Sequence, residues 1–457
     1  MQAFFDTLTS IVGFINDNIL WGIPMVVIIL GAGIFMTVRT RALQLRKFGV
    51  SISSTIVPTI KEMVHGKKHV HSKKEKSISQ FEAFSSAIAG TVGTGNIVGV
   101  AGAMLSGGPG AVFWMWVSAF LGMATAYGET ELGMKYRRRD QSGSWMSGAM
   151  VYLEQGLGCR WLAVIYAVLC LLASFGMGSM VQANAISETF EVAFSLPSFF
   201  IGGILTVMVG KILAGGAKTI AATAEKMVPL SAAIYILASV IVLVLFREQI
   251  PRAFAMIFTD AFAFQSASGG LMGFFVSRCV RYGVARGVFS NEAGLGSMAA
   301  LNGGVDRAEP GEQGQWAMFE VFFDTIVSCT VTALVILCTT GNELAGYSGN
   351  GAELTGLCFD RGLGSLGGYT VSMCIALFAF ATIIAWYYMG RQAVAYLGET
   401  VGRDVSKLYL CGYLTCVFLG SLGSMEAVWE ISDIFNGMMA IPNLLALILL
   451  VREVRRP

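Results

Sequence analysis

The chain has 457 residues, of which 55% are hydrophobic and only 13% are charged, and its formal net charge is +2. A soluble globular protein carries about 25% charged residues, so this composition excludes an ordinary soluble domain. Uncharged runs of about 20 residues are long enough to span a bilayer as helices, whereas the strands of a membrane barrel would alternate over about 10 residues. We therefore expect an all-α polytopic membrane protein.

Eleven apolar runs of spanning length follow one another along the chain. They cover residues 19–38, 82–105, 111–134, 161–186, 197–214, 227–246, 268–300, 316–340, 366–390, 406–424 and 432–451. Each run predicts one transmembrane helix, and the second and seventh runs differ from the others in composition.

Lysine and arginine are concentrated between residues 39 and 79, directly after the first run. Cytoplasmic loops carry an excess of these residues, so this segment predicts a cytoplasmic loop. The basic residues after the third, fifth and ninth runs agree with that orientation, as do Arg452, Arg455 and Arg456 at the C-terminus. We expect a multi-pass protein of the cell (inner) membrane with its N-terminus outside and its C-terminus in the cytoplasm.

The second and seventh runs are poor membrane helices. The second contains "AGTVGTGNIVGV" at residues 89–100, and each glycine weakens a helix by about 1 kcal/mol relative to alanine. The seventh contains Arg278, Arg281, Arg286 and Glu292, although a charge at the bilayer centre costs at least about 2.5 kcal/mol. Both runs therefore predict interrupted helices, and the alternative for the glycines is close packing between helices.

The two interruptions lie five spans apart, so their helices run in opposite directions. This arrangement is typical of transporters built from inverted repeats, with the binding site between the interrupted helices. We expect an N-terminal helix and basic loop at 1–79, a first repeat of five helices at 80–262, and a second repeat with a short cytoplasmic tail at 263–457. Half-helix N-termini suit a carboxylate, and free carbonyl groups suit a cation.

Several sequence blocks carry a family resemblance. They are "TVGTGNIVGVAGA" from residue 91, "GGPGAVFWMWVSAFLG" at 107–122, "GMGSMVQAN" at 176–184, "GVARGVFSNEAGLGS" at 283–297, "FEVFFDTIVSCT" at 319–330 and "FAFATIIAWYYMG" at 378–390. In this order they resemble the alanine or glycine:cation symporter family, also called the sodium:alanine symporters, over residues from about 80 to 400.

The resemblance implies a LeuT-like fold with a 5+5 inverted repeat after one extra N-terminal helix. It also implies a transporter and not an enzyme, which carries alanine, glycine and other small neutral amino acids into the cell by alternating access. Sodium, or in some cases protons, is the implied coupling ion. The expected partners are thus a small neutral amino acid, the ion and the bilayer, with no nucleic acid and no need for an oligomer.

The resemblance also assigns site residues. Backbone N–H groups of the first interruption meet the substrate carboxylate, polar groups from the fourth and seventh runs bind the substrate, and two aromatic residues form its walls. The residues assigned to the substrate are Thr94, Gly95, Asn96, Gln182, Phe289, Ser290, Asn291 and Trp386.

The sodium ion is assigned to the carbonyl groups of Ala89 and Val92 and to the hydroxyl of Thr382. Ala381 and Ala385 depart from the pattern, since the resemblance leads us to expect Ser and Gly there. The first departure bears on the ion site and the second on the size of the pocket.

Buried carboxylates leave alternatives open. Glu320 and Asp324 lie four residues apart on one helix face, and they suit either a proton relay or a structural pair with Arg281 or Arg286. Glu129 is expected near the cytoplasmic interface, paired with a basic residue. The alternatives to a symporter are a sensor that keeps the same pocket without transport, a channel, and an intramembrane enzyme, for which no nucleophile–base motif is present.

Overall fold

The computed structural model describes residues 13–53, 57–58, 80–140, 143–263, 269–305, 310–422 and 426–455. Most of the predicted basic loop at 39–79 therefore lies outside the described residues. Within the described part the chain is mainly helical, and its β-structure is one antiparallel pair, Arg138–Arg139 (β1) with Trp145–Met146 (β2).

Helices occupy each of the predicted runs. The longer ones are α2 (Ile23–Arg39), α6 (Gln80–Thr91), α7 (Val98–Gly107), α8 (Ala111–Tyr136), α10 (Arg160–Phe175), α11 (Val181–Phe194), α12 (Ser198–Ala214), α13 (Gly216–Leu245), α15 (Gly269–Asn291), α17 (Pro310–Val321), α18 (Thr330–Thr340), α20 (Leu366–Val401), α21 (Ser406–Gly420) and α22 (Glu426–Leu449).

Shorter elements lie between and within these helices. They are α3 (Leu43–Arg46), α4 (Phe48–Ser51), α9 (Ala149–Gln155), α14 (Ile250–Ala261), α16 (Ser297–Asn302) and α19 (Gly351–Leu363), the π-helical η1 (Asn16–Leu20), η4 (Gly176–Met180) and η6 (Phe322–Cys329), and the 3-10 turns η3 (Thr94–Asn96), η5 (Arg247–Gln249) and η7 (Gly341–Gly346).

Six helical stretches of the described chain are long and apolar enough to cross a membrane. They are Ala111–Tyr136, Arg160–Phe194, Gly216–Leu245, Gly311–Gly346, Leu366–Val401 and Trp429–Leu449, and four shorter apolar helices accompany them. The protein is therefore a multi-pass membrane protein, while the count of eleven spans and the 5+5 arrangement stay predictions.

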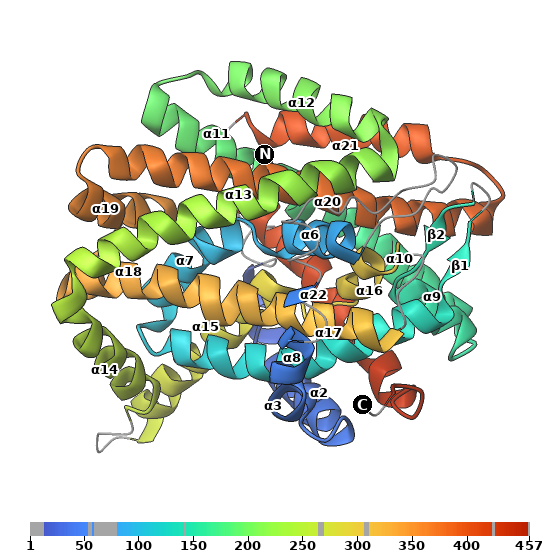
Figure 1. Ribbon diagram of the computed structural model, residues 1–457, viewed down its shortest axis with the longest axis horizontal. Coiled ribbons are helices and arrows are strands. Elements are labelled where there is room, and N and C mark those ends of the chain that lie inside the picture. Colours follow the sequence, from blue (N-terminus) through green and yellow to red (C-terminus); the bar gives the residue numbers. More distant parts are fainter. Residues whose placement is uncertain are drawn as a thin grey trace.

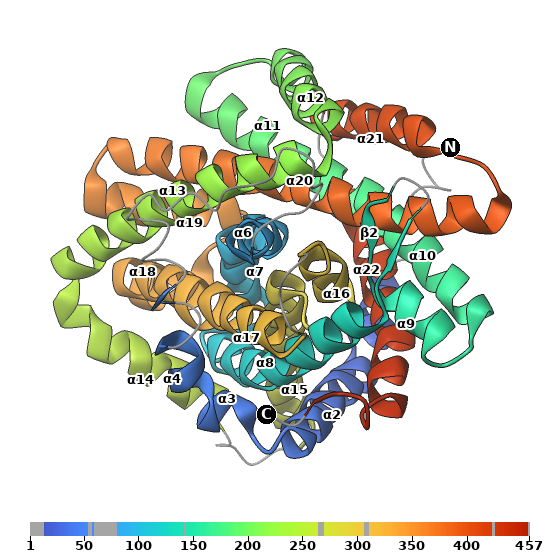
Figure 2. The same ribbon diagram turned by 45° about the vertical axis from the view of Figure 1, so that its right-hand side comes forward.

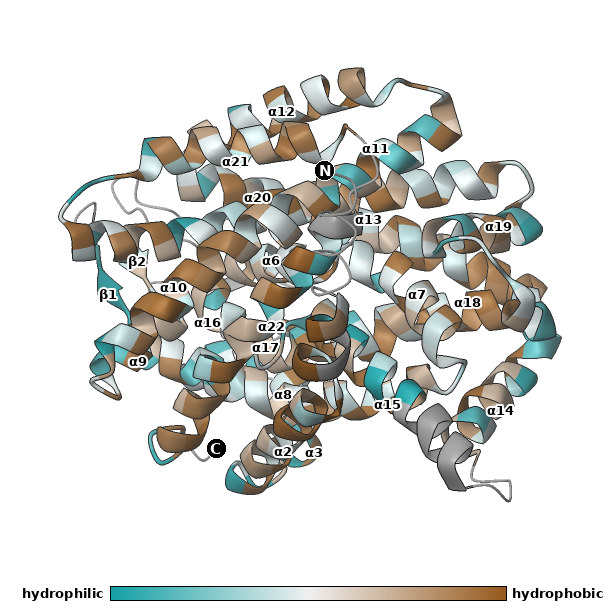
Figure 3. Ribbon diagram, turned by 180° about the vertical axis from the view of Figure 1, so that it is seen from behind, coloured by the Kyte–Doolittle hydropathy of each residue, from teal (hydrophilic) through white to brown (hydrophobic). Residues whose placement is uncertain are grey.

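The two interrupted helices lie at the centre of the bundle. Figures 1 and 2 show α6, α7 and α16 enclosed by the longer helices α8, α13, α17 and α20, with α12 and α21 side by side on the outside. Figure 3 shows hydrophobic residues along outer helices such as α2 and α12. On α12, Phe199, Ile204 and Val207 are exposed to 63%, 63% and 73%. A continuous apolar exterior of this kind suits lipid, since soluble monomers rarely expose one.

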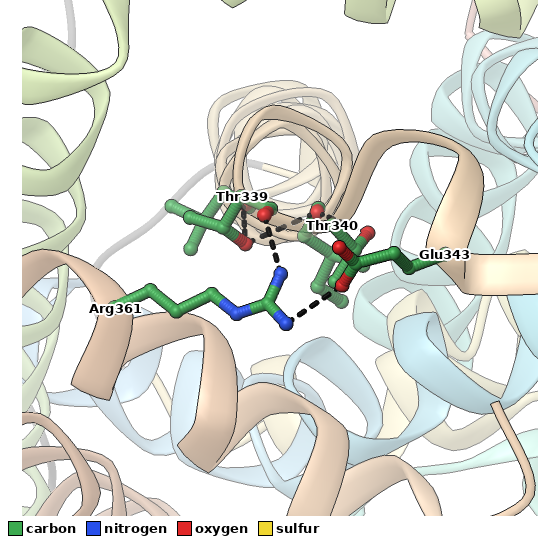
Figure 4. A network of polar contacts seen from close by, with 6 residues as sticks. Thr339, Thr340, Glu343 and Arg361 are labelled. Carbon is green, nitrogen blue, oxygen red and sulfur yellow. Dashed lines mark hydrogen bonds and ion pairs between the residues drawn. The ribbon is translucent and has the colours of Figure 1, made fainter.

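Polar contacts tie helix ends together where a connection leaves carbonyl groups free. Arg361 of α19 donates to the Thr339 carbonyl at 2.7 Å, close to the C-terminus of α18, and to Glu343 at 2.7 Å (Figure 4). The last carbonyls of a helix have no partner within it, so an arginine at this place both completes a hydrogen bond and complements the helix dipole.

Candidate functional site

The first interruption separates α6 from α7. The α-helix ends at Thr91, a 3-10 turn follows at Thr94–Asn96, and the helix resumes at Val98. The side-chain Oδ1 of Asn96 accepts the Gly93 N–H at 3.0 Å, so the turn satisfies one of its own freed donors. Freed backbone groups of this kind persist in a membrane only when they have polar partners. The interruption predicted in the second run is present.

The second interruption separates α15 from α16. The backbone leaves the helix after Asn291 and takes positive φ at Glu292 (56°), Gly294 (100°) and Gly296 (84°). Glycine adopts this left-handed region without the Cβ clash that other residues meet there, which accounts for the two glycines. The interruption predicted in the seventh run is therefore also present, and a non-glycine residue with positive φ stands at its start.

Neighbouring helices hold the second interruption in place. Glu129 of α8 accepts the Gly294 N–H at 2.7 Å and the Asn443 amide at 2.6 Å, and Asn443 also donates to the Gly294 carbonyl at 2.8 Å. Tyr166 of α10 donates to the Leu295 carbonyl at 3.0 Å. The expectation that Glu129 pairs with a basic residue is wrong, because this carboxylate is wholly buried and takes backbone and amide donors instead.

The two interruptions lie against each other. A Cβ added to Gly95 would be 3.5 Å from Ser290 Cα and 3.6 Å from Phe289 Cδ1. Such distances are ordinary van der Waals contact, so the first interruption packs directly on the second and a methyl group at position 95 would fit between them. The structure thus brings together Gly95, Phe289 and Ser290, which the sequence analysis assigned to one binding site.

Asp324 of η6 links the two interruptions. Its Oδ1 accepts the Asn96 amide at 2.7 Å, and its Oδ2 accepts the Ser290 hydroxyl at 2.8 Å and the Thr325 hydroxyl at 2.8 Å. Asn291 donates to Thr325 at 3.0 Å. Asp324 was not among the predicted site residues, and the signal that could have found it was a carboxylate in the middle of an apolar run.

Two arginines of the seventh run have partners other than that carboxylate. Arg286 lies 3.8 Å from Asp433 of α22 and over the Phe289 ring, and Arg278 donates to the Ser106 carbonyl at 2.6 Å. The expected pairing of Arg286 with Glu320 or Asp324 is therefore wrong. Among its described contacts the carboxylate of Glu320 accepts a hydrogen bond from Thr91 at 3.2 Å.

Gln182 contacts the first interruption. Thr94 donates from its hydroxyl to Gln182 Oε1 at 3.1 Å, and the Gln182 amide donates to the Met177 carbonyl at 3.3 Å. Met177 belongs to η4, where the wider π-helical turn breaks the regular hydrogen-bond pattern between α10 and α11. Gln182, from the fourth predicted span, thus lies beside the first interruption.

One residue predicted to hold sodium, Thr382, lies against the first interruption. Thr382 of α20 is buried, and a Cβ added to Gly93 would lie only 2.7 Å from its hydroxyl oxygen. Ala89, in the last turn of α6, and Val92, directly after that helix, are also buried, and their carbonyls complete the prediction. A hydroxyl and the freed carbonyls of one interrupted helix are oxygen ligands of the kind that hard cations prefer.

A cavity of about 170 Å³ opens beside the two interruptions. Its lining includes Thr94, Gly95 and Phe289 together with Tyr282 and Arg286. A ligand pocket for a drug-sized molecule measures about 300 to 1,000 Å³, so this one admits only a small ligand. A second cavity of about 50 Å³ shares the last three of these residues and extends toward α22.

The other predicted substrate residues are not part of this lining. Asn96, Gln182, Ser290 and Asn291 are buried and hydrogen-bonded to their neighbours, as described above. Trp386 is fully buried as well and packs closely on Gly178. A Cβ added to Gly178 would lie 2.6 Å from the Cβ of Trp386. Their roles toward a substrate stay predictions.

Comparison with known proteins identifies the family of this chain. The family model described as the sodium:alanine symporter family matches residues 5–456. The chain belongs to this family. Its family and fold are those of secondary transporters, specifically cation-coupled amino-acid symporters, and not of enzymes.

Relatives and solved structures agree with the family. The sodium/alanine symporter AgcS of Methanococcus maripaludis is 38% identical, with 96% of this chain and 94% of the relative covered. The putative sodium/proton-dependent alanine carrier YrbD of Bacillus subtilis is 36% identical, over 95% and 89%. The crystal structure of MhsT with L-phenylalanine matches at a TM-score of 0.58 and 16% identity, over 80% of this chain and 89% of that one, which shows the LeuT-like fold.

Proposed function

We propose that this chain is a symporter that carries alanine and glycine into the cell together with sodium, by alternating access between the two sides of the membrane. The observation that carries the proposal is the contact between two interrupted helices beside a cavity of about 170 Å³. A pocket of that size, walled in part by Phe289, fits a small amino acid.

The substrate carboxylate is proposed to bind the N–H groups of Thr94, Gly95 and Asn96. The first N–H groups of a half-helix lack helical partners, and the helix dipole favours an anion there. The Asn96 N–H also donates to the Gly93 carbonyl at 3.3 Å, a long bond that a substrate carboxylate would replace. Gln182 and the polar groups of Ser290 and Asn291 would fix the substrate from the other sides, while Trp386 limits the depth of the pocket.

Sodium is proposed to bind between the first interrupted helix and α20. The carbonyls of Ala89 and Val92 and the hydroxyl of Thr382 supply its oxygen ligands, and the short approach of Thr382 to Gly93 supports this arrangement. The family is sodium-coupled, and the choice of sodium for this chain rests on that membership and on the oxygen ligands.

The proposal includes the topology on which inward transport depends. The repeats would occupy 80–262 and 263–457 after the N-terminal segment 1–79, in the cell (inner) membrane, with the N-terminus outside and the C-terminus inside. One chain holds both interrupted helices, so a monomer would suffice for the pathway.

Glutamine is the competing substrate. The probable sodium/glutamine symporter GlnT of Bacillus subtilis is 36% identical, over 98% of this chain and 89% of the relative. We propose alanine and glycine over glutamine because the matching family model is that of the sodium:alanine symporters and because the cavity is small. A sensor without transport keeps the same pocket, and only a transport assay separates the two.

The test is uptake of labelled alanine, glycine and glutamine into proteoliposomes with an imposed sodium gradient. We expect alanine and glycine to accumulate against their gradients and glutamine to be excluded. Alanine binding without uptake under any gradient would indicate a sensor. Glutamine uptake as fast as alanine uptake would show that the pocket is larger in the transporting state than the cavity indicates.

A further inference from the structure

Glu292 stands at the start of the second interruption in a conformation that is rare for a glutamate. Its φ is 56°, and its side chain is completely buried. The backbone is held on both sides, since its N–H donates to the Val288 carbonyl at 2.7 Å and its carbonyl accepts the Leu295 N–H at 3.1 Å. The surrounding structure therefore maintains a left-handed residue that directs a carboxyl group into the protein interior.

The carboxyl group of Glu292 lacks the partners that the other buried carboxylates have. Within the part of the chain that the structure describes, neither oxygen has a hydrogen-bond partner. The Ser297 hydroxyl and the Trp386 indole N–H face it without reaching hydrogen-bond geometry, and they too are unpartnered. Asp324, by contrast, accepts three hydrogen bonds.

The charged groups that act on Glu292 have the same sign as its ionised form. They are Asp324 from η6 and Glu129 from α8. Three other titratable groups interact electrostatically with Glu292. They are Tyr166 and Cys170 from α10 and Glu320 from α17. None of these five groups is cationic. The carboxylates among them repel an ionised Glu292, and the neutral tyrosine and cysteine do not compensate its charge.

These surroundings decide which form of the carboxyl group is stable when it is enclosed. Burying an ionised carboxylate without a compensating charge costs several kcal/mol, whereas the neutral acid needs only ordinary hydrogen-bond partners. Sodium is a poor alternative occupant, because an indole N–H only donates and leaves the Ser297 hydroxyl as the one additional oxygen among these neighbours.

We propose that Glu292 is a proton-binding site: its carboxylate takes one proton from the aqueous phase before the second interrupted helix encloses it, and returns that proton when the helix opens. The acid O–H then donates a hydrogen bond to the Ser297 hydroxyl oxygen, and the Trp386 N–H donates to the acid carbonyl. Enclosure of the interrupted helix, and transport with it, depends on protonation of this one side chain.

The first measurement is infrared difference spectroscopy of the purified protein in lipid, titrated from acid to alkaline pH. We expect a carbonyl band of protonated carboxylic acid that loses intensity in Glu292→Gln. Glu129→Gln is the matched control, since its carboxylate already receives two N–H donors, and it keeps the contribution of Glu292. An acid band of unchanged intensity in Glu292→Gln, or no acid band at any pH, overturns the proposal.

The second measurement is the pH profile of alanine uptake at a fixed sodium gradient, with equal pH on both sides of the vesicle. Wild-type uptake falls as pH rises, because ionised Glu292 resists enclosure. Glu292→Gln, a permanent mimic of the neutral acid, becomes independent of pH, and Glu292→Asp restores the dependence. A wild-type profile in Glu292→Gln overturns the proposal.

A third variant covers the case in which Glu292→Gln fails to fold. Trp386→Phe removes an N–H that stabilises the ionised carboxylate, so the infrared titration should move to higher pH, and an unmoved titration overturns the proposal. Only the uptake assay rests on the proposed function. Loss of all alanine uptake with the acid band retained therefore overturns the proposed function and leaves the proton site standing.

Discussion

Removing the carboxylate of Asp324 should separate the two interrupted helices. Asp324→Ala leaves the Asn96 amide and the hydroxyls of Ser290 and Thr325 without their acceptor, at distances of 2.7, 2.8 and 2.8 Å in the intact protein. Each buried donor left unpaired costs about 1–3 kcal/mol, and the two hydroxyls can rotate toward other acceptors. We expect a loss of about 3–5 kcal/mol in the free energy of unfolding, comparable with the breaking of a buried ion pair.

Asp324→Asn isolates the charge from the shape. Its remaining oxygen still accepts from Asn96, and its new amide donates to the hydroxyl oxygens of Ser290 and Thr325, which can reverse their roles. What is lost is only the added strength that the acceptor's charge gives to these bonds, and no buried donor is left unpaired. Asp324→Asn should therefore be measurably less stable than wild type and clearly more stable than Asp324→Ala.

The assay is thermal unfolding in detergent, together with alanine binding to the purified variants. If the interruptions must stay in register to bind substrate, Asp324→Ala weakens alanine binding by at least about tenfold, which corresponds to 1.4 kcal/mol. The reasoning is refuted if Asp324→Ala matches wild type in both melting temperature and alanine affinity, or if the two variants are equally destabilised.

Three further substitutions test the contacts around the site. Gly93→Ala places a Cβ 2.7 Å from the Thr382 hydroxyl, so the sodium concentration for half-maximal alanine binding should rise about tenfold if 1.4 kcal/mol of ion binding is lost, and an unchanged value contradicts the sodium site. Gly178→Ala places a Cβ 2.6 Å from Trp386 Cβ, so overpacking should destabilise the protein by about 1–3 kcal/mol and lower its melting temperature in detergent. An unchanged melting temperature would contradict this close packing. Arg361→Ala should cost about 1–3 kcal/mol through the lost bond to a helix-terminal carbonyl, with Arg361→Lys as its control in chemical denaturation, and equal stability of wild type and both variants would show that the bond contributes nothing.

The interruptions themselves were predictable from the sequence. Helix propensity and bilayer energetics act on consecutive residues, so glycines with polar residues at 89–100 and charges at 278–292 reveal a break without knowledge of any contact. The sequence blocks around the breaks predicted the family, which the whole-chain match confirms. The role of Glu129 and the partner of Arg286 were predicted wrongly, because both depend on helices distant in the chain.

Composition, hydrophobic run length and the positions of helix-breaking residues thus determined that this chain is a multi-pass membrane protein with two interrupted helices. Only the tertiary structure decided how the buried polar groups are satisfied. The Asn96 amide donates a hydrogen bond to Asp324, 228 residues away in the chain. The Asn443 amide donates one to Glu129, 314 residues away. A membrane interior offers no water as a substitute partner, so these long-range pairings, and the carboxyl group of Glu292 that lacks one, follow from how the helices pack.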